Sequence, residues 1–192
     1  MKTKYDYIVG IDPDIERIGV AFLCVKSRIL QLTDMPLPEL LKAVPAYVDR
    51  YAREEPPLSL DPTVKVAVVV EIDRLHTGNW HLTQYDTKRS AASKGFDQGR
   101  CFHTAEAICD ILRYEGIEVI EKAPLVKMWS GPDRKITHEE LTSLQGINFM
   151  FKTNRHKSNQ EQRDAALLAL DLSDIPLILP PKKRKDRQIK TF

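Results

Sequence analysis

The chain has 192 residues, of which 42% are hydrophobic, and its formal net charge at pH 7 is +2. This length and composition predict one globular domain with a sizeable core. No apolar run approaches the roughly 20 residues that span a bilayer, and the N-terminus lacks the apolar segment of a secretory signal. The three cysteines have no metal-ligand spacing, so we expect reduced thiols in a cytosolic compartment.

Two short apolar runs, residues 7–11 and 18–23, predict a pair of strands joined by a tight turn. Pro13 fixes a backbone angle in that turn. Asp12 ends the first strand, where a carboxylate is costly to desolvate unless it is paired or binds a metal ion. The alternative is that Asp12 only caps the turn, and this stretch by itself favours neither role.

Residues 28–33 alternate between apolar and polar, which predicts a third, half-exposed strand. A helical pattern then runs from Leu37 through Tyr51, and Pro45 is expected to kink or divide it. The valine run at residues 64–70 is typical of a strand buried on both faces. Glu71 ends this strand, a position that lines the crevice of open α/β sheets; a solvated strand end is the alternative.

Residues 74–95 form a long polar stretch in which we expect a loop without regular structure. Aromatic and basic side chains are interleaved there, and this combination can stack on unpaired bases while its cations hold phosphate. The residues expected to bind nucleic acid in this way are Trp80, Tyr85, Lys88 and Arg89. The alternative is that Trp80 packs the loop onto the core. A helical stripe follows at residues 102–112, and residues 117–120 predict a further strand.

Thr137 and Glu140 form a capping-box pattern that opens a helix expected to continue to residue 147. The bases that precede this helix start suit phosphate binding. They are Lys127, Arg134 and Lys135.

The last predicted helix begins at Ser158 or Asn159 and carries two acids in its first turns. Glu161 and Asp164 are three residues apart and therefore project from the same side of the helix. The alternative is that the helix dipole alone favours acids at this end. A basic tail, residues 180–192, follows and suggests an anionic polymer as partner.

These residues, in this order, resemble the RuvC family of Holliday-junction resolvases in the ribonuclease H-like superfamily. The likeness spans residues 5–172. Its motifs are the opening Gly10-Ile11-Asp12-Pro13, the return strand Gly19-Val20-Ala21, the second acid Glu71, the closing pair in Glu161-Gln162-Arg163-Asp164, and the basic segment with Lys127 and the turn at 131–135.

The resemblance implies an α/β fold of the ribonuclease H-like type, with a mixed five-stranded sheet flanked by helices on both faces. Residues 1–179 would form the nuclease domain and residues 180–192 a separate basic tail. It also implies two Mg²⁺ ions per active site, with Mn²⁺ able to substitute, and a homodimer. The catalytic metal ligands would be Asp12, Glu71, Glu161 and Asp164.

The implied activity is hydrolysis of four-way DNA junctions by paired symmetric nicks that leave 5′-phosphate and 3′-hydroxyl ends. The implied location is the cytoplasm, either at the nucleoid or in the host cell of a virus or mobile element. The residues agree, because a site made only of carboxylates suits Mg²⁺ or Mn²⁺ rather than zinc. The alternatives are a same-fold nuclease for other branched DNA or RNA–DNA hybrids, and a junction-binding protein without catalysis.

Overall fold

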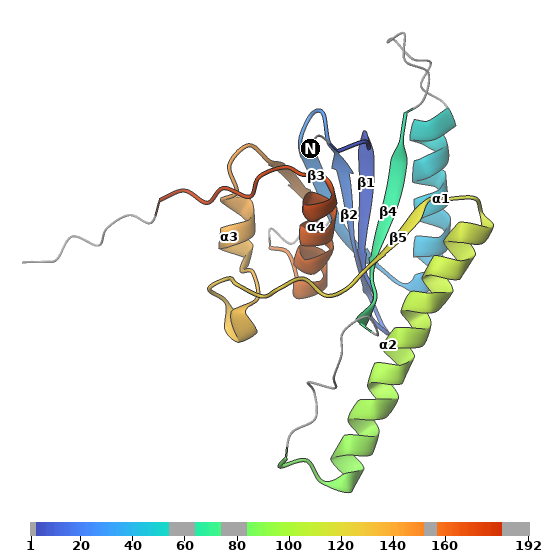
Figure 1. Ribbon diagram of the computed structural model, residues 1–192, viewed down its shortest axis with the longest axis vertical. Helices are drawn as coiled ribbons and strands as arrows, with labels where there is room; N and C mark the ends of the chain where they lie inside the picture. Colours follow the sequence, from blue (N-terminus) through green and yellow to red (C-terminus); the bar gives the residue numbers. More distant parts are fainter. Residues whose placement is uncertain (1–2, 54–63, 74–83, 152–156, 182–192) are drawn as a thin grey trace, which may run out of the picture.

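The fold is a mixed six-stranded sheet between two layers of helices, seen in a computed structural model that describes residues 3–53, 64–73, 84–151 and 157–181 (Figure 1). The strand order is β5-β4-β1-β2-β3-β6. The strands are β1 (Tyr7–Asp12), β2 (Ile18–Cys24), β3 (Ile29–Met35), β4 (Val66–Glu71), β5 (Val119–Lys122) and β6 (Asn148–Phe151). β1, β2 and β3 are antiparallel neighbours, β4 is parallel to β1, and β5 is parallel to β4. The expected α/β class is confirmed.

The sheet has one more strand than the sequence pattern predicts. β6 pairs in parallel with β3, with Ile29 opposite Asn148. Its four residues are too few to show an alternation, and they follow a segment that reads as helix. The helix opened by Thr137 is correspondingly shorter than expected, since α3 (His138–Thr142) ends five residues before residue 147. Pairing with β3 therefore overrides the local pattern.

Helices cover both faces of the sheet, as expected. α1 (Leu37–Arg53) and α2 (Lys88–Tyr114) lie on one face, while α3 and α4 (Gln160–Leu172) lie on the other (Figure 1). α1 is one continuous helix through Pro45, so the expected division of this helix does not occur. Among the helices described, none is both long and apolar enough to cross a membrane.

α2 begins much earlier than the sequence pattern predicts. The Thr87 hydroxyl accepts a hydrogen bond from the Ser90 backbone N–H and caps the helix, so residues 88–95 are helical rather than loop. Only the second half of α2 buries side chains, namely Ala105, Ile108, Cys109 and Leu112. The first half projects past the end of the sheet (Figure 1). A helix with no surface to cover needs no apolar stripe, which is why periodicity reveals only its second half.

Two hydrophobic cores lie on opposite faces of the sheet. Successive side chains of β4 point to opposite faces, so this strand contributes residues to both cores. Ala67 and Val69 join the core under α4, whereas Val68 and Val70 join the core under α1 and α2. Burial of β4 on both faces confirms the interpretation of the valine run. Because side chains alternate along a strand, Glu71 falls on the α4 face with Val69.

α4 approaches the sheet at two glycines. A Cβ atom on Gly10 would overlap the carbonyl oxygen of Ala165, and one on Gly19 would overlap the carbonyl oxygen of Glu161. Both obstacles are backbone atoms of α4, which cannot move aside as a side chain would. Glycine at these two positions therefore allows α4 to lie directly on β1 and β2.

Candidate active site

Asp12 and Glu71 come together because β1 and β4 run in parallel. Ile11 is paired with Val70, so the residues that end the two strands are neighbours at one edge of the sheet. Asp12 is two residues after Gly10, which faces α4, and Glu71 is two residues after Val69. Both carboxylates therefore lie on the α4 side of the sheet, at the carboxyl ends of parallel strands.

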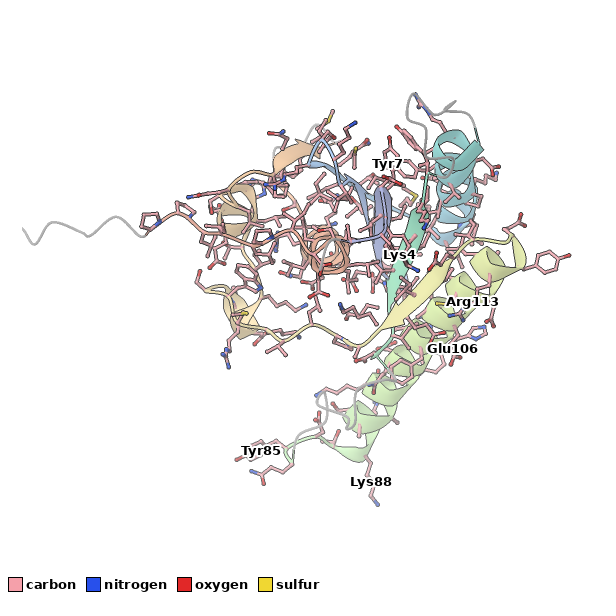
Figure 2. All side chains as sticks on the ribbon, turned by 45° about the horizontal axis from the view of Figure 1, so that its top comes forward. Lys4, Tyr7, Tyr85, Lys88, Glu106 and Arg113 are labelled. Carbon is pink, nitrogen blue, oxygen red and sulfur yellow. The ribbon has the colours of Figure 1, made fainter. Side chains whose placement is uncertain are left out.

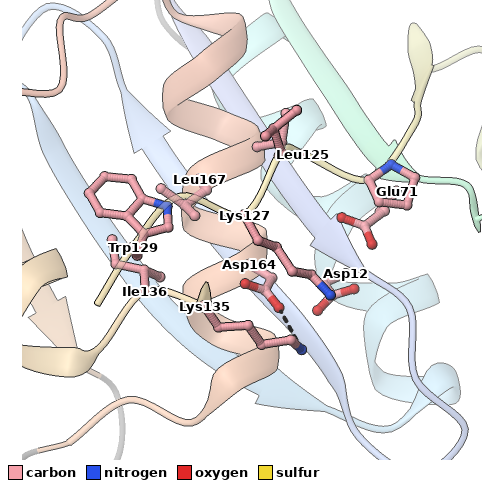
Figure 3. Close-up of a pocket in the computed structure, with 11 residues that line it drawn as sticks. Asp12, Glu71, Leu125, Lys127, Trp129, Lys135, Ile136, Asp164 and Leu167 are labelled. Carbon is pink, nitrogen blue, oxygen red and sulfur yellow. Dashed lines mark hydrogen bonds and ion pairs between the residues drawn. The ribbon is translucent and has the colours of Figure 1, made fainter. Parts of the chain in front are cut away.

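Asp164 on α4 completes a group of three carboxylates around one open pocket of about 100 Å³ (Figure 3). The pocket is closed on its other side by the segment that follows β5. The lining residues are Asp12, Glu71, Asp164, Lys127, Lys135, Pro124, Leu125, Val126, Trp129, Ile136 and Leu167. Three acids and two lysines that lie far apart in the sequence thus share one cavity.

Lys135 is held against Asp164, with its Nζ atom 3.3 Å from Asp164 Oδ2. The other oxygen, Oδ1, accepts a hydrogen bond of 2.7 Å from the Gln160 side-chain amide. Lys127 lines the same pocket, and its charge partly opposes the rise in the pKa of Glu71 (Figure 3). The lysines therefore offset part of the negative charge of the three acids and would meet any anion that enters the pocket.

A strained turn delivers Lys135 to this position. The Trp129 N–H donates to the Arg134 carbonyl and the Gly131 N–H donates to the Lys135 carbonyl, each at 3.0 Å. Asp133 and Arg134 both have left-handed backbone angles, with φ values of 52° and 59°. Such conformations are uncommon outside glycine and cost free energy, which the hydrogen bonds that close the turn help to offset. The predicted turn at residues 131–132 is confirmed.

Burial and neighbouring acids raise the pKa values of two pocket carboxyls, and the lysines only partly oppose this. Burial, followed by the charges of Glu71 and Asp164, raises the pKa of Asp12 well above its ordinary range, and Lys135 only partly opposes this. Burial, followed by the charges of Asp164 and Asp73, raises the pKa of Glu71 to about 7. Like charges held close together in a partly buried site favour protonation or a bound cation.

Glu161 is less central than its sequence match suggests. It is half-buried in the first turn of α4 and is absent from the residues that line the pocket. Its charge still raises the Asp12 pKa, but less than the charges of Glu71 and Asp164 do. Asp164 lies one turn further along the helix and faces the pocket directly (Figure 3). The two acids of the closing pair are thus not equivalent.

A second, smaller cavity of about 40 Å³ opens on the other side of Asp12 and Glu71, toward α2. Asp73 and Cys101 line it. Asp73 Oδ2 accepts a hydrogen bond from the Gln98 side chain of α2 at 3.4 Å, whereas its buried Oδ1 has no hydrogen-bond partner among the described residues. Burial and the charges of Asp14, Asp12 and Asp73 raise the pKa of the Cys101 thiol.

The donor set fits a hard divalent cation. Asp12, Glu71 and Asp164 offer only carboxylate oxygens, which Mg²⁺ and Mn²⁺ prefer, and burial together with the charge of Asp164 raises the pKa of Glu71, which a bound cation would oppose. Within the described ranges, no group of three or more Asp, Glu, His or Cys side chains lies close enough together to form a complete metal site. A carboxylate triad that shares one pocket with two lysines is nevertheless a suitable place for cations that arrive with a phosphate.

The other residues predicted to bind nucleic acid lie away from the pocket. Tyr85 and Lys88 stand at the tip of α2, far from the sheet (Figure 2), and Tyr85 is 85% exposed. Arg89 is exposed in the next position of the same helix, and Arg134 is exposed in the strained turn. Trp80 lies outside the described residues.

Sequence reasoning missed the contacts that fix the start of α4. Gln162 is only 4% exposed, and its side-chain Nε2 donates to Asp34 Oδ1 at 2.7 Å, while its Oε1 accepts from the Asn159 N–H at 3.1 Å. Arg17 in turn binds Asp34 through both the carboxylate and the backbone carbonyl. The Asn159–Gln162 spacing is itself a capping-box pattern, which is the one signal that could have drawn attention to Gln162.

No family model matches this sequence, and no curated protein matches it. Two solved structures of RuvC from T. thermophilus are similar to the chain. One is RuvC in complex with a Holliday junction substrate, with 15% identity, coverage of 86% of this chain and 91% of that chain, and a TM-score of 0.40. The other is a structure of RuvC, with 18% identity, coverage of 86% of this chain and 93% of that chain, and a TM-score of 0.37. Similarity at this level does not establish a function.

Proposed function

We propose that this protein is a metal-dependent endonuclease that cuts branched DNA, with the four-way junction as its substrate. The observation that carries the proposal is the pocket itself: Asp12, Glu71 and Asp164 converge from β1, β4 and α4, and Lys127 and Lys135 share the cavity with them. A cleft that holds three carboxylates suits cations, and its lysines suit phosphate. Phosphodiester hydrolysis is the reaction that uses both.

In this proposal Asp12, Glu71 and Asp164 hold the divalent metal ions, Mg²⁺ or Mn²⁺, with Glu161 as an outer member of the set. The ions, when bound, supply charge stabilisation for the attacking and leaving oxygens of the phosphodiester. Lys135, which is oriented by the strained turn and by Asp164, holds the scissile phosphate. Lys127 lines the same pocket and contributes a second cation. Leu125 and Trp129 form apolar parts of its lining and pack against the core under α4.

The four-way junction as substrate, the homodimer and the paired nicks are supported by the likeness of the sequence motifs to the RuvC family. The Gly10 and Gly19 positions of those motifs have a physical reason in this chain, because they let α4 bring Asp164 onto the sheet. The same pocket would also accept a phosphate of a fork or an RNA–DNA hybrid.

The test compares cleavage of a four-way junction, a fork, an RNA–DNA hybrid and a linear duplex by the wild type and by Asp12→Asn in Mg²⁺. We expect symmetric nicks in the junction, little cutting of the linear duplex, and loss of activity in Asp12→Asn. Asp133→Asn is the matched control, because Asp133 is exposed in the strained turn and asparagine tolerates its left-handed backbone.

The outcomes of this comparison distinguish between the possible functions. Full cleavage by Asp12→Asn would show that the pocket is not the catalytic site. Equal cutting of the junction and the linear duplex would show that the four-way junction is not the specific substrate. Preferential cutting of the RNA–DNA hybrid would identify the hybrid as the substrate instead. Tight junction binding without cleavage in Mg²⁺ or Mn²⁺ would identify a binding protein that has kept the fold.

A further inference from the structure

The segment between β5 and the strained turn has two chemically different sides. Residues 124–129, the pocket strap, are extended and lie across the carboxyl ends of the strands (Figure 1). Leu125, Lys127 and Trp129 are partly buried and line the pocket, whereas Val126 is 84% exposed and Met128 is 72% exposed. Because side chains of an extended chain alternate, the strap turns one face to the pocket and the other to solvent.

Both ends of the pocket strap are anchored, so its outer side chains are held in place. Leu125 and Trp129 pack against the core under α4, and the Trp129 N–H donates to the Arg134 carbonyl at 3.0 Å. Single exposed apolar residues are common on protein surfaces and need no explanation. Here two large ones flank Lys127, which lines the pocket, and Val126 is itself among the lining residues.

The size of the pocket decides what can lie against these side chains. Its volume of about 100 Å³ is well below the roughly 300–1,000 Å³ of sites that enclose a whole small molecule. It admits a phosphate group with its cations but not a nucleoside. The sugars and bases on either side of that phosphate must therefore lie outside the pocket, along its rim.

We propose that Val126 and Met128 contact the sugar and base faces of the nucleotides that flank the phosphate in the pocket. This inference rests on the proposed function, since it takes the bound strand to be nucleic acid. Charge complementarity favours that occupant over a second copy of the chain. The same pocket carries Lys127 and Lys135, so an apolar contact at Val126 and Met128 lies beside cations that attract a phosphate backbone. Apolar side chains commonly contact bases and sugars between such phosphate contacts.

The experiment measures binding of full-length protein to a four-way junction with 2-aminopurine beside the cut position, in Ca²⁺ so that the strand stays intact. The variant is Val126→Ser/Met128→Ser, and the matched control is Met150→Ser on β6, where the methionine is also exposed at 53%. We expect about tenfold weaker binding and a reduced 2-aminopurine response for the double variant only. The salt dependence of binding should be unchanged, because no cation is removed.

Three results would overturn the inference. The double variant could bind and report on 2-aminopurine as the wild type does, which would leave the strap outside the interface. It could bind equally well but lose self-association in sedimentation, which would assign Val126 and Met128 to contact with a second copy. If the wild type itself failed to bind any of the nucleic acids, the proposed function would fail, and this inference with it.

Discussion

The side-chain amide of Gln162 donates a hydrogen bond to Asp34 at 2.7 Å, and this contact joins the start of α4 to the end of β3. Asp34 also binds Arg17 from the turn between β1 and β2. The first turn of α4 is therefore tied to two parts of the sheet at once. Asp164 lies two residues after Gln162, so the same contacts determine where it meets Asp12.

Replacing Gln162 with methionine should therefore loosen the start of α4. The change keeps the length of the side chain but leaves Asp34 Oδ1 without its donor, which should lower the free energy of unfolding by about 1–3 kcal/mol. Urea denaturation measures this, and Mn²⁺ binding by calorimetry should weaken in parallel. The control is Gln145→Met, because Gln145 is exposed. Equal stability of the two variants would contradict a positioning role for Gln162.

The two glycines beneath α4 should not tolerate a methyl group. Gly10→Ala and Gly19→Ala would force backbone atoms of α4 away from the sheet, at a cost of roughly 1–3 kcal/mol or more. We expect lower melting temperatures and loss of cleavage. Gly99→Ala provides the opposite control, since nothing lies within 4 Å of its new methyl group and the residue is in α2. That change should stabilise the protein by about 0.5–1 kcal/mol. A stable, active Gly10→Ala would refute the close approach.

The stability of the metal-free protein should fall as the pH rises toward neutrality. Folding raises the pKa of Glu71 from 4.5 to about 7, so the folded chain binds this proton more tightly than the unfolded chain does. The contribution of protonated Glu71 is therefore present below about pH 4.5 and is lost as the pH rises to about 7. It amounts to at most about 3 kcal/mol.

Glu71→Gln removes this titration and should stabilise the metal-free protein above pH 7 relative to the wild type. Urea denaturation in EDTA at pH 5 and pH 8 measures the difference. Glu139→Gln serves as the control, because the Glu139 side chain is 71% exposed. If the wild type and Glu71→Gln lost stability in parallel between the two pH values, the Glu71 carboxyl would not be the titrating group.

Lys135 should act on turnover more than on folding. Lys135→Met removes the cation that contacts Asp164 and, in the proposed function, holds the scissile phosphate. We expect kcat for junction cleavage to fall roughly 10²-fold, as when another electrostatic stabiliser is removed from an active site. Lys157→Met is the control, because Lys157 is 78% exposed. An unchanged kcat with a raised KM would restrict Lys135 to substrate binding.

The strands and the acids at their ends could be predicted because their signals are local. Apolar residues precede Asp12, and valines precede Glu71. These two runs indicate which strands are buried and where they end. The caps at Thr137 and Asn159 are likewise local patterns, and both are present in the structure. Fold class and the starts of α3 and α4 therefore follow from short stretches of sequence.

Features that depend on distant partners could not be predicted. β6 exists because Ile29 offers an edge at which Asn148 can pair, and residues 148–151 alone do not show this. The unequal placement of Glu161 and Asp164 depends on how α4 rotates over Gly10 and Gly19, which spacing within the helix does not reveal. The contact between Gln162 and Asp34 joins residues 128 positions apart.

The order of synthesis has a consequence for the activity that we propose. Asp12 and Glu71 leave the ribosome early, but Asp164 lies on α4, which also supplies the buried residues that cover the sheet on that face. A nascent chain that stops before Gln160 therefore has Asp12 and Glu71 on a sheet that α4 does not yet cover, and it lacks Asp164. Cutting activity would arise only when α4 docks, so unfinished or truncated chains would be unable to damage the DNA around them.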